Sequence, residues 1–318
     1  MSAASGAVPA GQVDVRSSGS LRPAEAAEVL DLVRQAAEAD GVSPLSEHAT
    51  LSVRHGLDEG ARHVRLLESG RLAGYGHFDP GDPADGPAGE MVVRPSARRR
   101  GLGRALGRAL VAEAGGRQLR LWAHGDLPAA TALAVAAGFH RSRALWQMRR
   151  PMASPLADPQ VPEGISVRTF RVGQDEDAWV AVNHRAFAHH PEQGSWTRAD
   201  LELREREPWF DPGGFFLAER ATGLAGFHWT KVHQGRAGSP AIGEVYVVGV
   251  DPAEQGTGLG RALTLIGLRY LSGRGLPAVM LYADEINVAA IRLYESLGFV
   301  HSGTDVMFAG GGVPAQQA

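Results

Sequence analysis

Cysteine is absent from this chain of 318 residues, and lysine occurs only once, as Lys231. The absence of cysteine excludes disulfide frameworks, thiolate metal sites and a cysteine nucleophile. No apolar run is long enough to span a bilayer. The formal net charge of −3 gives no indication of a basic surface for nucleic acid. We therefore expect a cytoplasmic protein without membrane or nucleic-acid partners.

The two ends of the chain contain little that predicts structure. Residues 1–20 have no basic segment followed by an apolar core, so we expect a flexible tail rather than a signal peptide. Residues 310–318 are expected to form a second flexible tail. The length between them fits two domains of ordinary size.

One pattern occurs twice, which predicts two tandem domains of common ancestry. Residues 98–104 (RRRGLGR) return as residues 255–261 (QGTGLGR). Each copy follows an apolar strand-like run and begins an amphipathic helix. Further matching pairs lie downstream, at residues 121–124 (LWAH) and 281–284 (LYAD), and at residues 136–139 (AAGF) and 296–299 (SLGF).

Hydrophobic periodicity and turn residues predict an α/β order in both halves. The proline-rich stretch 151–164 is expected to link a first domain, 21–150, to a second domain, 165–309. For the first domain we expect a helix at 23–39, a hairpin at 64–78, a strand from 91, a helix from 101, a strand at 118–123, a helix at 128–137 and a strand at 144–149. For the second we expect a strand at 165–170, helices at 175–188 and 197–206, a hairpin at 215–232, a strand at 242–250, a helix at 258–272, a strand at 278–283, a helix at 288–297 and a strand to about 308.

Glycines at a strand-to-helix turn let the backbone approach a phosphate, whose charge meets free N–H groups and the helix dipole. A dinucleotide site would instead need Gly-x-Gly-x-x-Gly with an acidic residue about 20 positions later. Neither copy has that combination. The repeated turn therefore indicates binding of a phosphate-bearing ligand of another kind.

The ordered combination resembles a known superfamily. The chain is similar to the GCN5-related N-acetyltransferases (GNAT) in the order of its elements. A strand is followed by Gln/Arg-x-x-Gly-x-Gly at the start of a helix, then by a second strand, and then by Asn-x-x-Ala-x-x-x-Tyr-x-x-x-Gly-Phe. That resemblance implies two tandem GNAT domains, each with a mixed central sheet flanked by helices. It also implies acetyl-CoA as co-substrate and no metal.

Longer runs narrow the resemblance to the mycothiol synthase family, over nearly the whole chain except its tails. The family transfers the acetyl group of acetyl-CoA to the cysteinyl amine of a cysteine–glucosamine–inositol pseudodisaccharide, which gives mycothiol. The matching runs are 189–194 (HHPEQG), 227–233 (FHWTKVH), 243–252 (GEVYVVGVDP), 287–292 (NVAAIR), 40–42 (DGV), Glu47 and 147–151 (QMRRP).

The chemistry of this transfer requires a base and favours an acid. An α-amino group has a pKa of about 7.7–8.0, so near neutrality much of it is protonated and cannot attack a thioester. The resemblance implies Glu244 as the base and Tyr294 as the acid that protonates the CoA thiolate. Glu244 could instead be a solvated strand carboxylate. Tyr294 could be a core residue, because Val288, Ile291, Tyr294 and Leu297 share one helical face.

The resemblance also implies the residues that contact acetyl-CoA in each domain. In the second domain the strand would pair with the pantetheine arm, the glycine loop would wrap the pyrophosphate and the following helix would form the far wall. Asn287 could instead act only as a helix N-cap. The second-domain residues are Val248, Gly249, Val250, Gln255, Gly256, Thr257, Gly258, Leu259, Gly260, Arg261, Asn287, Val288, Ala289, Ala290, Ile291 and Arg292. The first-domain residues are Met91, Val92, Val93, Arg99, Arg100, Gly101, Leu102, Gly103 and Arg104.

For the acceptor, the family's binding positions correspond to Glu47, Glu192, Lys231, Glu244 and Tyr282. Carboxylates suit a cationic amine and sugar hydroxyls, and a lysine can donate to hydroxyls. Because Glu47 comes from the first half, we expect the acceptor site to use both domains. Each of these residues could instead be an ordinary surface charge.

The first copy lacks the residues that the second would use for catalysis. Through the repeat, Tyr294 aligns with Ala134, Asn287 with Leu127 and Glu244 with Pro87. Glu90 is three positions from Pro87, which on a strand predicts the opposite face. We infer a first domain that binds CoA without catalysis.

Two other functions stay open at this point. The same chemistry could serve another small amine or a protein N-terminus. Alternatively, the chain could be a CoA-binding sensor without catalysis, although retention of Glu244 and Tyr294 in one copy only argues against it. Tandem copies already form a two-lobed body, so we expect a monomer.

Overall fold

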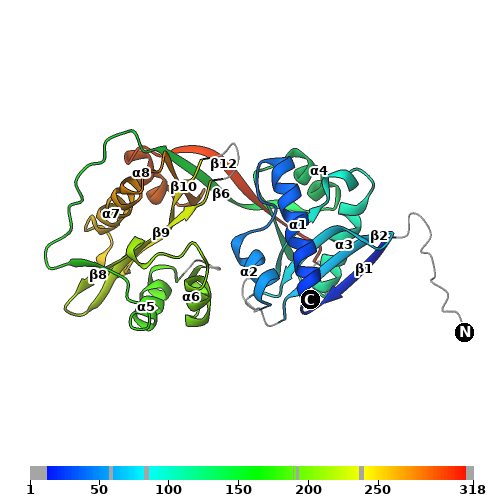
Figure 1. Cartoon of the computed structure of the whole chain (residues 1–318), viewed down its shortest axis with the longest axis horizontal. Helices are drawn as coiled ribbons and strands as arrows, with labels where there is room; N and C mark the ends of the chain where they lie inside the picture. Colours follow the sequence, from blue (N-terminus) through cyan, green and yellow to red (C-terminus); the bar gives the residue numbers. More distant parts are fainter. Residues whose placement is uncertain are drawn as a thin grey trace, which may run out of the picture. The chain divides into compact units, whose positions relative to one another are not determined.

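The computed structural model describes residues 13–56, 60–81, 86–188, 190, 193–235 and 240–312. The chain divides into two compact units (Figure 1). Unit 1 comprises Met1–Ala144 and Thr304–Ala318, and unit 2 comprises Leu145–Gly303. No described helix is long and apolar enough to cross a membrane.

Unit 1 has a mixed sheet in the order β1-β2-β3-β4-β5-β12. Only the β4–β5 pair is parallel; the other neighbours whose pairing is defined run antiparallel. Its elements are β1 (Val13–Ser18), α1 (Pro23–Asp40), α2 (Glu47–His55), β2 (Arg62–Glu68), β3 (Arg71–Asp79), β4 (Ala88–Val93), the 3-10 turn η1 (Pro95–Ala97), α3 (Leu102–Glu113), β5 (Leu119–Ala123), α4 (Pro128–Ala136) and the part of β12 (Val300–Gly310) that begins at Thr304.

Unit 2 repeats this plan in the order β6-β11-β10-β9-β8-β7. Here the β10–β11 pair is the parallel one. Its elements are the part of β6 (His140–Pro151) that begins at Leu145, β7 (Ser166–Thr169), α5 (Glu176–Ala186), η2 (Gln193–Ser195), α6 (Arg198–Glu205), η3 (Pro212–Gly214), β8 (Phe215–Arg220), β9 (Gly223–His233), β10 (Ile242–Val250), η4 (Pro252–Glu254), α7 (Leu259–Gly273), β11 (Ala278–Asp284) and α8 (Val288–Ser296).

Each unit takes one sheet strand from the other half of the sequence. In unit 2, β6 pairs with β11 and places Met148 opposite Leu281. In unit 1, β12 pairs with β5 and places Phe308 opposite Leu121. The expected domain boundaries, 21–150 and 165–309, therefore need correction, because the strand at the end of each half completes the sheet of the other unit.

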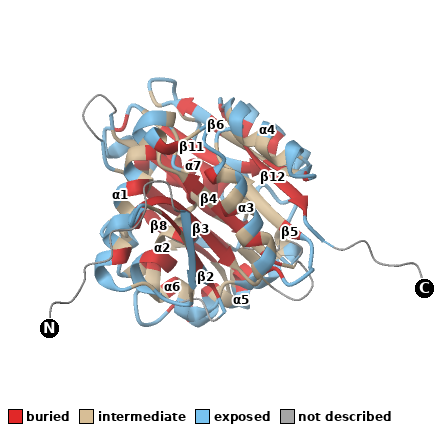
Figure 2. Ribbon diagram, turned by 90° about the vertical axis from the view of Figure 1, so that its right-hand side faces the viewer, coloured by how far each residue is buried: buried red, intermediate tan, exposed pale blue. Residues whose placement is uncertain are grey.

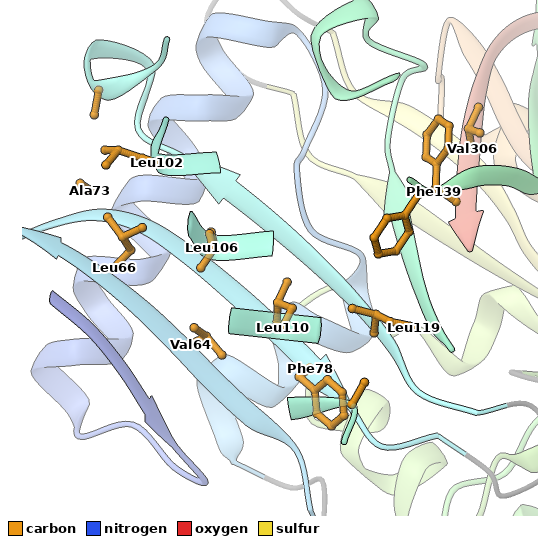
Figure 3. Close-up of a cluster of buried hydrophobic side chains, with 13 residues drawn as sticks. Val64, Leu66, Ala73, Phe78, Leu102, Leu106, Leu110, Leu119, Phe139 and Val306 are labelled. Carbon is orange, nitrogen blue, oxygen red and sulfur yellow. The ribbon is translucent and has the colours of Figure 1, made fainter. Parts of the chain in front are cut away.

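The core of unit 1 lies on both faces of its sheet. Leu102, Leu106 and Leu110 of α3 pack on one face, against Val64 and Leu66 of β2 (Figure 3). On the other face α1 and α2 pack against residues that include Tyr75 and Val92. The periodic leucines of α3 are all buried, as an amphipathic helix on a sheet requires.

Unit 2 follows the same arrangement. Leucines of α7, together with Tyr294 of α8, pack on one face of the sheet against Val245 and Leu281. On the other face, α5 and α6 cover an aromatic cluster that includes Trp179 and Trp229. Figure 2 shows buried residues concentrated on the central strands of the sheet and exposed residues on the outer surfaces of the helices.

Several local predictions are confirmed. The helix that begins at Pro23 ends at Gly41, which takes a left-handed conformation with φ of 74°. The hairpin from β2 to β3 turns at Ser69 and Gly70, both with positive φ. Two expectations differ from the structure. Within the predicted tail 1–20, Val13–Ser18 form β1 and pair with β2, and α2 was not predicted. Residues 1–12 of that tail and residues 313–318 of the predicted C-terminal tail lie outside the described residues.

Candidate active site

The strands β10 and β11 of unit 2 separate part of the way along and form a fork. Their parallel pairing runs from Gly243 to Val245, whereas β10 continues to Val250 along β9. A bulge lies between Val245 and Val247 of β10, so Tyr246 is the extra residue. A bulge bends its strand and interrupts the ladder. The backbone from Val248 to Val250 therefore faces the fork, where a pantetheine arm could pair with it.

Glu244 lies at the base of this fork. It is 7 % exposed and faces Lys231 on β9 and Met280 on β11. Directly opposite residues share a face of the sheet, so these three side chains form one row. Nε2 of His233 lies 2.6 Å from Oε2 of Glu244. His233, which was not among the predicted site residues, thus contacts the proposed base.

Tyr294 reaches the sheet from the other side. It lies in α8 and is 7 % exposed, with its ring 5.9 Å from that of Phe299. Burial raises the pKa of Tyr294 to about 12. The phenol therefore keeps its proton near neutrality, as an acid must. The ring is also part of the core, so the structural reading and the catalytic reading of this residue are compatible.

Glu244 and Tyr294 lie on opposite faces of the sheet. Val245 packs in the same cluster as Tyr294, and neighbouring residues on a strand point to opposite faces. In a continuous sheet the two groups could not act on one atom. The pairing of β10 with β11 ends at Val245, so the sheet is not continuous beyond this residue.

Lys231, the single lysine, lies on the Glu244 face. It is 8 % exposed, and its Nζ lies 4.2 Å from the ring centre of Trp209 and 4.9 Å from that of Tyr246. Such contacts hold an ammonium group by the quadrupole of the rings. Tyr282, two positions after Met280, shares this face and is 39 % exposed. Its hydroxyl accepts a hydrogen bond from Gln147 Nε2 at 2.9 Å.

The glycine loop of unit 2 leads from β10 into α7. Gly256 and Gly258 adopt φ of 79° and 91°, in the left-handed region that glycine tolerates best. The first N–H groups of a helix have no partner within the helix, so those of α7 can bind an anion. Thr257 Oγ1 donates to the Glu254 carbonyl at 2.7 Å, and Arg261 donates to Ser296 at 2.7 Å. The side chains of Thr257 and Arg261 are thus engaged within the protein, which favours the prediction that the backbone of this loop would bind a pyrophosphate.

The start of α8 is exposed. Asn287 accepts a hydrogen bond from Ala290 N at 3.1 Å, so it acts as an N-cap. Val288 is 51 % exposed, and Ala289 and Arg292 are exposed as well, while Ala290 is half-buried and Ile291 faces the core. This surface is accessible to a ligand, as the predicted far wall requires, but Ile291 is not.

Two predicted acceptor residues, Glu192 and Glu47, are not among the described residues of unit 2. Glu192 lies outside the described residues. Glu47 is the first residue of α2 in unit 1, after the N-cap Ser46. The other acceptor candidates, Lys231, Glu244 and Tyr282, are brought together on one face of unit 2.

Unit 1 has the same fork and loop with different side chains. The parallel pairing of β4 with β5 ends at Glu90, while β4 continues through Met91 and Val92 to Val93. Gly101, with φ of 82°, precedes α3, which contains Leu102, Gly103 and the exposed Arg104. Arg98 forms a double ion pair with Asp40, and Arg100 pairs with Glu68 at 2.7 Å. Of the arginines predicted to bind phosphate here, Arg100 is therefore already held by its ion pair with Glu68, whereas Arg99 is exposed.

A buried charged network lies at the fork of unit 1. His124 Nδ1 is 2.8 Å from Asp305, and its Nε2 is 3.5 Å from Glu90. Glu90 also accepts a hydrogen bond from Ser46 N at 2.7 Å. Burial alone would lower the pKa of His124, but the hydrogen bonds and charges of the two carboxylates outweigh it and raise the pKa to about 10. His124 is therefore an imidazolium at neutral pH.

The strand pairing corrects the alignment of the two halves around Glu90. Ala88 pairs with Arg120 as Glu244 pairs with Met280, and the LWAH and LYAD runs align these two partners. Ala88, rather than Pro87, is thus equivalent to Glu244, because the bulge at Tyr246 adds one residue to β10. Glu90 lies two positions further and so on the same face, contrary to the prediction.

Within the described residues, no group of histidine and acidic side chains could hold a metal ion. Sequence reasoning missed His233, His124 and Asp305, and it placed Glu90 on the wrong face of its strand. His233 could have been found by alternation, since it lies two positions after Lys231 on the same strand. The unit 1 network could not, because Asp305 is distant in sequence and reaches unit 1 through β12.

Comparison with known proteins identifies similar chains. The family model of the acetyltransferase (GNAT) family matches residues 28–139 and 180–299. The chain is 59 % identical over 287 residues to a mycothiol acetyltransferase of Thermobispora bispora, covering 90 % of this chain and 96 % of the relative. It is 55 % identical over 307 residues to a mycothiol acetyltransferase of Acidothermus cellulolyticus, covering 92 % and 94 %.

Solved structures share the tandem fold. A GCN5-related N-acetyltransferase from Sphaerobacter thermophilus aligns with a TM-score of 0.66 and 25 % identity, over 94 % of this chain and 95 % of that one. A tandem GNAT protein from the clavulanic acid biosynthesis pathway aligns with a TM-score of 0.72 and 23 % identity, over 95 % and 99 %. The second likeness concerns the fold alone.

Proposed function

The chain belongs to the acetyltransferase (GNAT) family, and from that premise we propose that it transfers the acetyl group of acetyl-CoA to the cysteinyl amine of cysteinyl-glucosaminyl-inositol, giving mycothiol and CoA. The observation that carries the choice of acceptor is the identity of 55–59 % with two mycothiol acetyltransferases over about nine-tenths of the chain. The forked sheet and glycine loop of unit 2 support the use of acetyl-CoA.

In this proposal Glu244 accepts the proton of the cysteinyl ammonium. Its carboxylate lies at the base of the fork, on the same face as Lys231 and Tyr282. The acceptor would therefore bind on this face, with its hydroxyls near the ammonium of Lys231. A base within hydrogen-bond reach typically contributes a factor of about 10² to 10⁴ in rate.

The thioester would lie in the fork itself, accessible from both faces. The freed amine attacks the thioester carbon, and negative charge develops on the carbonyl oxygen. The unpaired backbone edge of Val248 to Val250 would supply an N–H to that oxygen. As the C–S bond breaks, Tyr294 would give its proton to the departing CoA sulfur. The attacking nitrogen would lose its second proton, which restores the phenol of Tyr294 through solvent, and Glu244 would release the first proton to solvent.

We propose that unit 1 binds CoA without catalysis. At the position equivalent to Glu244 it has Ala88, and at the position equivalent to Tyr294 it has Ala134. Neither methyl group can move a proton. We further propose that the protein works as a monomer in the cytoplasm, on small molecules and without nucleic acid.

An acceptor panel tests the proposed function. The purified protein is mixed with acetyl-CoA and one of three amines: cysteinyl-glucosaminyl-inositol, glucosaminyl-inositol without the cysteine, or a peptide with a free N-terminus. Release of CoA is followed with a thiol reagent, after subtraction of the acceptor thiol. We expect turnover with the cysteinyl compound alone. Equal or faster turnover of the peptide would show that the acceptor is wrong.

A further inference from the structure

The contact between His233 and Glu244 is the shortest side-chain contact described at the proposed base. The two residues lie diagonally across the antiparallel pair of β9 and β10: Glu244 is opposite Lys231, and His233 is opposite Ile242. Diagonal neighbours are within reach of long side chains. Nε2 of His233 lies 2.6 Å from Oε2 of Glu244, the distance of a charge-assisted hydrogen bond.

The direction of this hydrogen bond follows from the chemistry of the carboxylate. An ionised carboxylate has no hydrogen to donate, so the hydrogen must be on Nε2 of the imidazole. The base must be ionised before it can take a proton from the amine. In the reactive state, therefore, His233 donates and Glu244 accepts.

Because Glu244 is buried, its carboxylate depends on hydrogen bonds such as the one from His233. The side chain of Glu244 is 9 % exposed, whereas that of His233 is 37 % exposed. A buried carboxylate without hydrogen bonds is strongly disfavoured as an anion. Hydrogen bonds also become stronger where water is excluded. His233 can stabilise the anion while its own ring remains in contact with solvent.

Two further residues lie directly opposite Glu244 in the sheet. Met280, its partner on β11, offers only a thioether. Lys231, its partner on β9, has its ammonium group over the faces of Trp209 and Tyr246, at 4.2 and 4.9 Å. In the proposed function this ammonium group contacts the hydroxyls of the acceptor.

We propose that His233 is a positioning residue for Glu244: by donating to Oε2, it leaves Oε1 as the oxygen that takes the proton from the acceptor amine. A glutamate side chain has three rotatable bonds, and a hydrogen bond to one oxygen fixes where the other one lies. Displacement of a reacting group by about 1 Å can cost a factor of about 100 in rate. This inference rests on the proposed role of Glu244.

Three variants separate a donor role from a packing role. His233→Gln keeps an N–H at a similar distance from the backbone, whereas His233→Leu keeps an apolar side chain without any donor. We expect His233→Leu to lower kcat by about 10- to 100-fold, with the KM for acetyl-CoA unchanged. We expect His233→Gln to stay within about threefold of the unaltered protein. His301→Leu, the same exchange at an exposed residue of unit 2 that packs on Trp146, is the matched control and should keep full kcat.

The double variant provides a second readout. If His233 acts only through Glu244, then Glu244→Gln with His233→Leu should be no slower than Glu244→Gln alone. The inference would be overturned if the kcat losses of the two single variants multiply in the double variant. It would also be overturned if His233→Leu has a normal kcat, or if His233→Gln and His233→Leu lose kcat by the same factor. If Glu244→Gln alone keeps the normal rate, the proposed base is wrong. If Glu244→Gln is inactive and His233→Leu is normal, only the role of His233 is wrong.

Discussion

Ala88 of β4 and Glu244 of β10 occupy equivalent positions in two sheets of the same design. Each lies on the strand before a glycine loop. Ala88 pairs with Arg120 and Glu244 pairs with Met280, and these two partners directly precede Leu121 and Leu281, which align through the repeat. One position has a methyl group and the other a buried carboxylate that contacts an imidazole. The two units thus share a fold and differ at the point where a proton would be moved.

The first prediction concerns Tyr294. Its ring packs in the core, so Tyr294→Phe should fold normally while it lacks the hydroxyl. We expect kcat to fall by at least about 100-fold. Because burial raises the pKa of Tyr294 to about 12, the phenol stays protonated throughout the usual assay range. Initial rates at pH 7 and pH 9 should therefore show the same relative loss, and a loss that disappears at one pH would argue against an acid role.

A second prediction compares the two glycine loops. Gly258 and Gly101 have φ of 91° and 82°, and an added Cβ would meet no heavy atom within 4 Å at either position. Replacement by alanine therefore acts through backbone strain alone, at a cost of about 1–2 kcal/mol. We expect Gly258→Ala to raise the KM for acetyl-CoA by about 5- to 30-fold.

Gly101→Ala is the matched variant in unit 1. It imposes the same strain on the loop that we propose to be non-catalytic, so steady-state rates should not change. An increase in the KM for acetyl-CoA with Gly101→Ala, and none with Gly258→Ala, would place turnover in unit 1.

A third prediction tests the exchange of strands. Phe308 is 4 % exposed and belongs to the core of unit 1, although it lies near the C-terminus. Met148 is fully buried in unit 2, although it lies in the first half of the chain. Each alanine substitution should cost about 2–5 kcal/mol of stability. Hydrogen exchange should then increase in α3 for Phe308→Ala and in α7 for Met148→Ala. The reverse pattern would contradict the exchange.

A fourth prediction concerns pH and the network of His124. Hydrogen bonds and charges from Asp305 and Glu90 outweigh burial and raise the pKa of His124 from 6.5 to about 10. A raised folded-state pKa contributes stability that is complete below pH 6.5 and is lost as the pH rises through 10. At about 1.4 kcal/mol per pKa unit, the loss should reach a few kcal/mol.

Denaturant unfolding at pH 7 and pH 10 measures this loss. His124→Gln should be less stable than the unaltered protein at pH 7 and should lose less stability on going to pH 10. His140→Gln, at an exposed residue of the same unit, should behave like the unaltered protein. A parallel decline in all three proteins would exclude His124 as the titrating group.

Much of the architecture is predictable from the sequence, because its signals are local. Pro23 at the first position of α1, the C-cap Gly41, the hairpin turn at Ser69 and Gly70, and the two glycine loops fix the order of the elements. The repeat predicts that both halves share this order. The equal lengths of α4 and α8 confirm the alignment of Leu127 with Asn287.

The remaining features depend on tertiary pairing. β6 and β12 have the pattern of strands, but nothing in their residues specifies whether each pairs with β5 or with β11. One bulge, at Tyr246, shifts the alignment of β4 with β10 and so reverses the predicted face of Glu90. The contact of His233 with Glu244 depends on the register between β9 and β10, which the sequence of neither strand determines alone.

The most direct test of the catalytic account is the initial rate of Glu244→Gln with acetyl-CoA and cysteinyl-glucosaminyl-inositol, together with its binding of acetyl-CoA. The substitution keeps the size of the side chain and removes the carboxylate. The account predicts that kcat falls by about 10²- to 10⁴-fold while acetyl-CoA binds as before. A variant that turns over at the rate of the unaltered protein would contradict it.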